Sequence, residues 1–124
     1  MTSSFDLEAH VRKFQKELAS GTVSLTLLAV LAHAPEPLYG YQIAKQLEQQ
    51  AGGVLAGKQS ALYPVLRNLE TAGLLSSMIE PSQSGPPRRY YTITNDGRTV
   101  LEHWSQTWFA TRNSIDAVLE PGLS

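Results

Sequence analysis

A segment of turn-forming residues late in the chain separates two short stretches that have the composition of β-strands. The segment is Pro81-Ser82-Gln83-Ser84-Gly85-Pro86-Pro87, and the residues on either side of it, 74–80 and 88–94, include β-branched and aromatic side chains. Proline and glycine favour turns and disfavour the interior of helices and strands. The pattern therefore predicts a β-hairpin with a protruding tip, and any fold of this chain must place that hairpin near the C-terminal third.

The part of the chain before the hairpin has helical rather than strand periodicity. Apolar residues recur at spacings of three and four, which predicts helices over residues 5–20, 23–34, 39–50 and 58–72. We expect Gly21 to separate the first two helices, and Pro35 and Pro37 to end the second. Pro64 should lie in about the first turn of its helix or introduce a kink, and Gly73 should follow that helix in a left-handed conformation.

The chain after the hairpin predicts one long helix over residues 95–119. Thr94 has the character of an N-cap, and Asp96 would lie in the first turn, where the helix dipole favours an acid. Large side chains then repeat at three and four residues, in a heptad-like series: Leu101, Trp104, Trp108, Thr111, Ile115 and Val118. Such a series predicts a long packing surface.

Composition limits the classes of protein that this chain can belong to. A chain of 124 residues, 42% of them hydrophobic and 17% charged, suits one ordered domain. It has no cysteine, which excludes disulfides and thiolate metal sites. The longest apolar stretch, residues 23–34, is too short to span a bilayer, and we find no signal-peptide pattern, so we expect a cytoplasmic protein with no membrane partner.

The order of these elements favours a mainly α fold with a small β-hairpin, the winged helix-turn-helix. In that fold the helix before the hairpin can enter the major groove of DNA, and the hairpin forms the wing. The first and last helices carry apolar stripes that a small central domain cannot cover, which predicts a homodimer. We therefore divide the chain into an N-terminal dimerisation helix (1–20), a DNA-binding domain (21–94) and a C-terminal dimerisation helix (95–124). The predicted dimer residues are Leu7, Val11, Phe14, Leu18, Leu101, Trp104, Trp108 and Ile115.

Charge is balanced overall and basic locally. Ten basic residues against eleven acidic ones give a net charge of −1, so DNA binding must rest on local clustering. Between positions 58 and 98 there are five basic and three acidic residues. Polar side chains of the helix at 58–72 lie off its apolar stripe: Lys58, Gln59, Ser60, Tyr63 and Arg67. Serine, glutamine and arginine suit base edges, whereas lysine and tyrosine more often hold phosphates.

Several motifs, taken in this order, resemble the PadR family of transcriptional regulators. They are Leu38-Tyr39-Gly40-Tyr41, the run Ser60-Ala61-Leu62-Tyr63-Pro64-Val65-Leu66-Arg67-Asn68-Leu69-Glu70 with Gly73-Leu74-Leu75, and Arg88-Arg89-Tyr90-Tyr91-Thr92-Ile93-Thr94 with Gly97 and Leu101. The resemblance covers residues 21–119, and the single C-terminal helix is similar to the shorter members of the family. The family often has histidine where this chain has Tyr39.

The resemblance implies a homodimeric repressor that binds an inverted repeat with ATGT and ACAT arms and occludes a promoter. Tyr41, Ser60, Tyr63 and Arg67 match positions from which the family reaches double-stranded DNA, and Arg88-Arg89 matches its basic wing. The family sometimes holds an aromatic effector between subunits, and Trp108 matches a tryptophan used in this way.

Other interpretations of the same residues remain open. Trp104 and Trp108, one helical turn apart, could serve dimer packing instead of ligand stacking. The wing arginines could be solvated charges, and Tyr63 could pack on the helix surface. The three histidines lack metal-ligand spacing, and no catalytic or cofactor motif is present, so we expect neither a metal, a cofactor nor an enzyme. The competing functions are a protein-interaction module without DNA binding and a small-molecule-binding protein that uses the tryptophan-lined interface.

Overall fold

The N-terminal third of the chain is one helix. In the computed structural model, which describes residues 4–51, 59–82 and 84–120, α1 runs without interruption over Leu7–His33. The expectation of two helices separated by Gly21 is therefore wrong. Glycine inside a helix costs about 1 kcal/mol relative to alanine but keeps helical backbone angles, and the long run of helix formers on both sides outweighs that cost. Asp6 caps the helix, its carboxylate accepting a hydrogen bond from the backbone N–H of Ala9 at 3.1 Å.

The hydrophobic core lies around the C-terminal half of α1. Leu27, Leu28, Ile43 and Leu66 are fully buried there. Ile43 belongs to α2 (Gly40–Ala51) and Leu66 to α4 (Gln59–Thr71), so three helices meet at this point. Leu62, Leu66 and Leu69 form the buried stripe of α4, as the sequence predicted. The helix continues through Pro64, which lies in its second turn rather than its first.

A three-stranded antiparallel sheet covers one side of this core. The predicted hairpin is present as β2 (Leu75–Glu80) and β3 (Arg88–Ile93), paired from Leu75 opposite Ile93 to Glu80 opposite Arg88. A third strand, β1 (Leu38–Tyr39), pairs with the free edge of β3, so the strand order is β1-β3-β2. We predicted a helix from Tyr39; a two-residue strand has no period of its own and forms because β3, fifty residues away in sequence, offers an edge.

One junction joins the end of α4, the start of β2 and the start of α5 (Asn95–Leu119). Gly73 has a φ of 82°, and the N–H groups of Gly73 and Leu74 donate to Glu70 and Leu69 in a Schellman motif. Thr94 caps α5 by accepting from the Gly97 N–H at 3.0 Å, and its hydroxyl donates to the Gly73 carbonyl at 2.7 Å. The predicted roles of Gly73, Thr94 and the first-turn acid Asp96 are confirmed.

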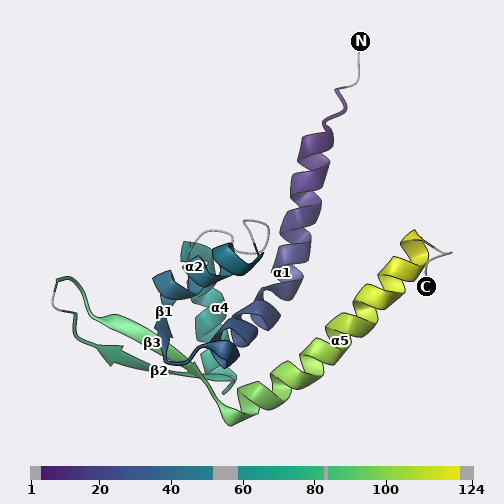
Figure 1. Cartoon of the computed structure of the whole chain (residues 1–124). Coiled ribbons are helices and arrows are strands. Elements are labelled where there is room, and N and C mark those ends of the chain that lie inside the picture. The colour runs from purple at the N-terminus through teal and green to yellow at the C-terminus, as the bar shows by residue number, and fades with distance from the viewer. Residues whose placement is uncertain (1–3, 52–58, 83, 121–124) are drawn as a thin grey trace.

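The terminal helices extend from the core as two long arms, and the wing points away from both termini (Figure 1). The apolar stripe of the first arm is exposed, with Leu7 61%, Val11 45%, Phe14 63% and Leu18 38% accessible. Within one chain, α5 therefore leaves this stripe exposed. Leu101 and Trp104 pack against the core, whereas Ile115 is 49% exposed. Both arms thus present apolar surface that the described chain leaves uncovered.

Candidate nucleic-acid interface

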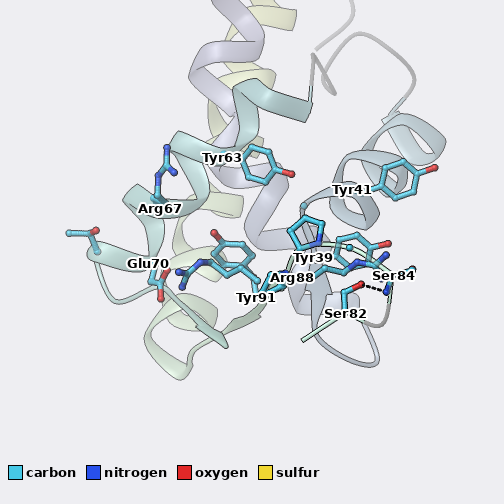
Figure 2. A pocket seen from close by; sticks show the side chains of 15 residues that line it. Tyr39, Tyr41, Tyr63, Arg67, Glu70, Ser82, Ser84, Arg88 and Tyr91 are labelled. Carbon is cyan, nitrogen blue, oxygen red and sulfur yellow. Dashed lines mark hydrogen bonds between the residues drawn. The ribbon is translucent and has the colours of Figure 1, made fainter. Parts of the chain in front are cut away.

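A hollow of about 720 Å³ lies between the start of α2, the exposed face of α4 and the wing. It brings together Tyr41, Tyr63, Arg67, Arg88 and Arg89, five of the eight residues that the sequence assigned to DNA. Figure 2 shows Tyr63, Arg67 and Glu70 on the α4 side, Tyr39, Tyr41 and Arg88 on the other side, and Tyr91 between them. Residues from three separate parts of the chain therefore share one surface.

The face of α4 toward the hollow follows from helical spacing. Tyr63, Arg67 and Glu70 recur at four and three residues, on the side opposite the leucines that enter the core. Tyr63 and Arg67 are exposed, and Glu70 is half-buried. The wing adds Arg88 and Arg89, both exposed. Three arginines against one glutamate make the described lining of the hollow positive.

The first wing arginine rests on a cluster of tyrosines. The guanidinium carbon of Arg88 lies 4.5 Å from the centre of the Tyr39 ring. Tyr39 in turn stacks on Tyr41 with ring centres 6.3 Å apart, and meets Tyr90 edge to face at 5.3 Å. The backbone N–H of Tyr39 also donates to the side-chain oxygen of Gln42 at 3.1 Å. Tyr39 is therefore fixed from several directions and offers Arg88 a rigid ring.

The second wing arginine is tied to α4 by a chain of hydrogen bonds. Arg89 Nη1 donates to the hydroxyl of Ser77 at 2.8 Å, and that hydroxyl donates to Glu70 Oε2 at 2.6 Å. Ser77 lies opposite Tyr91 in the sheet, and Tyr91 is 3% exposed. Burial raises the pKa of Tyr91 above 10.0, while the charge of Arg89 lowers that pKa and the charge of Glu70 raises it. Both charged groups thus act on the same buried phenol.

Close packing explains the glycine in the Leu38-Tyr39-Gly40-Tyr41 motif. A Cβ atom on Gly40 would lie 2.5 Å from Cε1 of Tyr63 and 2.9 Å from its hydroxyl oxygen. The Tyr63 ring therefore lies directly on the backbone at the start of α2, which links the two helices at the edge of the hollow. Packing on Gly40 is one task of Tyr63, and its exposed part faces the hollow.

The other predicted DNA-binding residues fall where the structure gives no side-chain detail. Lys58 lies outside the described residues, as do the side chains of Gln59 and Ser60, whose backbone begins α4. Conversely, sequence reasoning assigned no site role to four residues of this region: Tyr39, Gly40, Glu70 and Ser77. The Tyr-Gly-Tyr motif could have pointed to Gly40. The hydrogen bonds of Ser77 to Arg89 and Glu70 could not be predicted in this way, because they depend on the register of β2 and β3.

Comparisons with known proteins agree with this geometry. The family model described as the "transcriptional regulator PadR-like family" matches residues 27–103, more than half of the chain. This chain belongs to the PadR-like family. The match includes every element around the hollow but omits α1 before residue 27 and α5 after residue 103.

Solved PadR-family structures extend the likeness into the arms. A PadR family transcriptional regulator from Eggerthella lenta has a TM-score of 0.75 and 32% identity over 91% of this chain and 95% of its own. A PadR-like regulator from Bacillus cereus has a TM-score of 0.68 and 25% identity over 84% of this chain and 97% of its own. The fold is thus the winged helix of these transcriptional regulators, mainly helical with a small sheet.

A curated relative covers a smaller region. The negative transcriptional regulator PadR of Bacillus subtilis is 27% identical over 67 residues, which is 54% of this chain. The chain spans only 37% of that relative's length, so the likeness concerns a part of that protein.

A second, mainly apolar groove of about 430 Å³ lies between the two arms of this PadR-like chain. Trp104, Trp108 and Ile115 line it from α5, and Leu18 and Leu25 line it from α1. Glu17 is the single charged residue among its described lining residues. Trp108 is half-buried, so part of its side chain remains accessible in the groove. Among the described residues no group of histidine, aspartate and glutamate could hold a metal ion, and no helix is long and apolar enough to cross a membrane.

Proposed function

We propose that this PadR-family chain is a transcriptional repressor that binds an inverted-repeat operator as a homodimer and blocks its promoter. The observation that carries the proposal is the positive hollow between α4 and the wing, in which three exposed arginines and two exposed tyrosines converge. This is the side-chain chemistry that holds phosphates and reads base edges.

The proposal gives each element a part in DNA binding. In this proposal α4 is the recognition helix: Gln59, Ser60 and Arg67 would bind base edges, and Tyr63 and Lys58, the residue before the helix, would bind phosphates. Tyr41 lies at the start of α2, and the wing carries Arg88 and Arg89 beside the recognition helix. A local charge of about two per subunit is modest, so useful affinity requires two subunits on one duplex.

The homodimer is supported by the exposed stripes of the arms. Phe14 and Leu7 are more than half exposed on α1, as are Phe109 and Val118 on α5. A second copy that covers these residues would remove a large apolar surface from water and fix the spacing of two recognition helices. The groove beside Trp108 would then lie at the interface, where a flat aromatic effector could stack and release the repressor.

Selection from random duplexes, followed by titration at several salt concentrations, tests the proposal. We expect an enriched inverted repeat, with ATGT and ACAT arms as the default, and a log–log salt slope of about −0.9 for each phosphate neutralised. Replacement of Arg67 should relax preference at particular base pairs by about 1–3 kcal/mol if its contact is bidentate. Absence of binding to any duplex would overturn the repressor and favour a protein-interaction module, for which the net charge of −1 is suitable.

A further inference from the structure

We propose that the two adjacent wing arginines have different tasks: Arg88 is the phosphate-binding arginine, held in place by Tyr39, whereas Arg89 is a positioning residue that fixes the wing against α4. The inference rests on the proposed DNA binding. It assigns a role to Tyr39 and separates two residues that the sequence treats as one basic pair.

Strand geometry places the side chains of Arg88 and Arg89 on opposite faces of β3. Successive residues of a β-strand point to opposite faces, and Arg88 lies opposite Glu80 whereas Arg89 lies opposite Ile79. Tyr39 pairs with Tyr90, so the Tyr39 ring is on the Arg88 face. Ser77 pairs with Tyr91 and is on the Arg89 face, toward α4. Each arginine therefore has its own set of neighbours.

The Tyr39 ring restrains the Arg88 side chain without neutralising its positive charge. Its guanidinium lies over the Tyr39 ring at 4.5 Å, and in the described part of the chain it has no carboxylate partner and no hydrogen-bond acceptor. A cation–π contact restrains the side chain but leaves its N–H donors for another acceptor. The donors also lie beside the hollow, where a DNA phosphate would come. Restraint in advance of binding lowers the entropy that the contact costs.

Arg89 has a partner within the protein. Its Nη1 group donates to Ser77, whose hydroxyl donates to the Glu70 carboxylate, so a positive and a negative group share one serine. The chain of bonds runs from β3 through β2 to α4 and sets the wing against the recognition helix. A nearby carboxylate also offsets the field that Arg89 presents to a phosphate. The hydrogen bond to Ser77, more than the charge of Arg89, is then what DNA binding requires.

Glutamine variants separate the two tasks, because glutamine removes the positive charge but keeps a polar side chain, and the salt slope reports the loss of charge. With the duplex enriched by the wild-type protein, Arg88→Gln should reduce the salt slope by about 0.9 per subunit and the affinity about fivefold per subunit near physiological salt. Arg89→Gln and Arg89→Ala should both lose affinity, because neither side chain reaches Ser77 as the arginine does, and both should leave the slope unchanged. Arg12→Gln, at an exposed ion pair on the arm, is the control for loss of one positive charge.

Tyr39 is tested through its dependence on Arg88. Tyr39→Phe keeps the ring and should bind as the wild type does, whereas Tyr39→Leu should bind about two- to fivefold more weakly per subunit. In the Arg88→Gln background Tyr39→Leu should have little further effect, because the cation is gone. Thermal unfolding of each variant shows whether the fold is intact. If Tyr39→Leu does not fold, the DNA affinities and salt slopes of Tyr39→Phe, Arg88→Gln and Arg89→Gln test the inference.

Two results would overturn the inference and leave the repressor in place. One is an equal fall in slope for Arg88→Gln and Arg89→Gln, and the other is the same loss from Tyr39→Leu in both backgrounds. If the wild-type protein binds no duplex, the proposed function fails together with the inference.

Discussion

At the scale of single residues, two glycines in helical positions have opposite surroundings. A Cβ atom at position 40 would overlap the Tyr63 ring, whereas one at position 21 would meet nothing within 4 Å. Gly40→Ala should therefore displace Tyr63, lower the melting temperature and weaken DNA binding. Gly21→Ala, its matched control, should raise the free energy of unfolding by up to about 1 kcal/mol and leave DNA binding unchanged. Equal effects of both substitutions would show that Tyr63 moves aside at no cost.

The buried phenol of Tyr91 should make the stability of the fold depend on pH in the alkaline range. Burial raises the pKa of Tyr91 above its ordinary value of 10.0, so the folded chain holds this proton more tightly than the unfolded chain. The contribution of the protonated Tyr91 to the free energy of unfolding is fully present below pH 10.0. It is lost as the pH rises through the higher pKa of the folded chain. Urea titrations at increasing pH should show a steeper loss of stability for the wild type than for Tyr91→Phe. Parallel losses would mean that another group titrates.

The candidate site could be predicted in part at this scale. Helical spacing, strand composition and the family motifs are local patterns, and they singled out Tyr63, Arg67, Arg88 and Arg89. All four line the hollow, and their contact with DNA stays a prediction. The partners of the arginines could not be found in the same way. Tyr39 meets Arg88 across β1–β3, and Glu70 meets Arg89 through Ser77, so each contact depends on which strands pair and in what register.

At the scale of elements, caps and long periodic helices were predicted well, and interruptions less so. α5 has the predicted bounds because Thr94 is a strong N-cap and the apolar repeat continues to Leu119. The predicted break at Gly21 is absent because residues 7–19 are mostly good helix formers and residues 27–31 pack in the core, so the helix continues between them. The short strand β1 was missed because its stabilisation comes from β3 and not from its own two residues.

The junction at Thr94 gives an element-scale prediction. Its hydroxyl both caps α5 and donates to Gly73, so Thr94→Ala removes two hydrogen bonds that hold α5 to the end of α4. We expect a loss of about 1–2 kcal/mol in the free energy of unfolding, measured by chemical denaturation. Thr94→Ser retains the hydroxyl and should lose only a fraction of this. A serine variant as unstable as the alanine variant would point to the lost methyl group instead.

At the scale of the whole molecule, the exposed arm of α1 predicts self-association. Phe14 is 63% exposed on the apolar stripe, whereas Lys16 lies off that stripe. Phe14→Glu should place a charge in the dimer interface and shift the protein toward monomers in sedimentation experiments, and Lys16→Glu should not. Deletion of residues 1–19 should weaken the dimer or cause aggregation through the uncovered α5 stripe, while the core around Leu27 and Leu28 stays folded. A well-folded, monomeric wild-type protein at micromolar concentration contradicts this arrangement.

The same two arms offer a route from a ligand to the wing. An effector releases a repressor only if it binds the DNA-incompetent dimer more tightly than the competent one. α5 begins directly after β3, and Thr94 ties its first turn to the end of the recognition helix, so a shift of α5 would move both DNA-binding elements. A flat aromatic compound beside Trp108 would favour whichever dimer opening fits its ring.

Tryptophan substitutions test this coupling. Flat aromatic compounds should quench tryptophan fluorescence and weaken operator binding in parallel. Trp108→Ala should remove both effects and leave the dimer and the DNA affinity of the free protein largely intact. Trp104, which packs against the core as well as lining the groove, is the matched comparison, and Trp104→Ala should mainly lower the melting temperature. Loss of the dimer in Trp108→Ala would show instead that this indole is a packing residue, because a ligand-stacking face contributes little to an interface that forms without ligand.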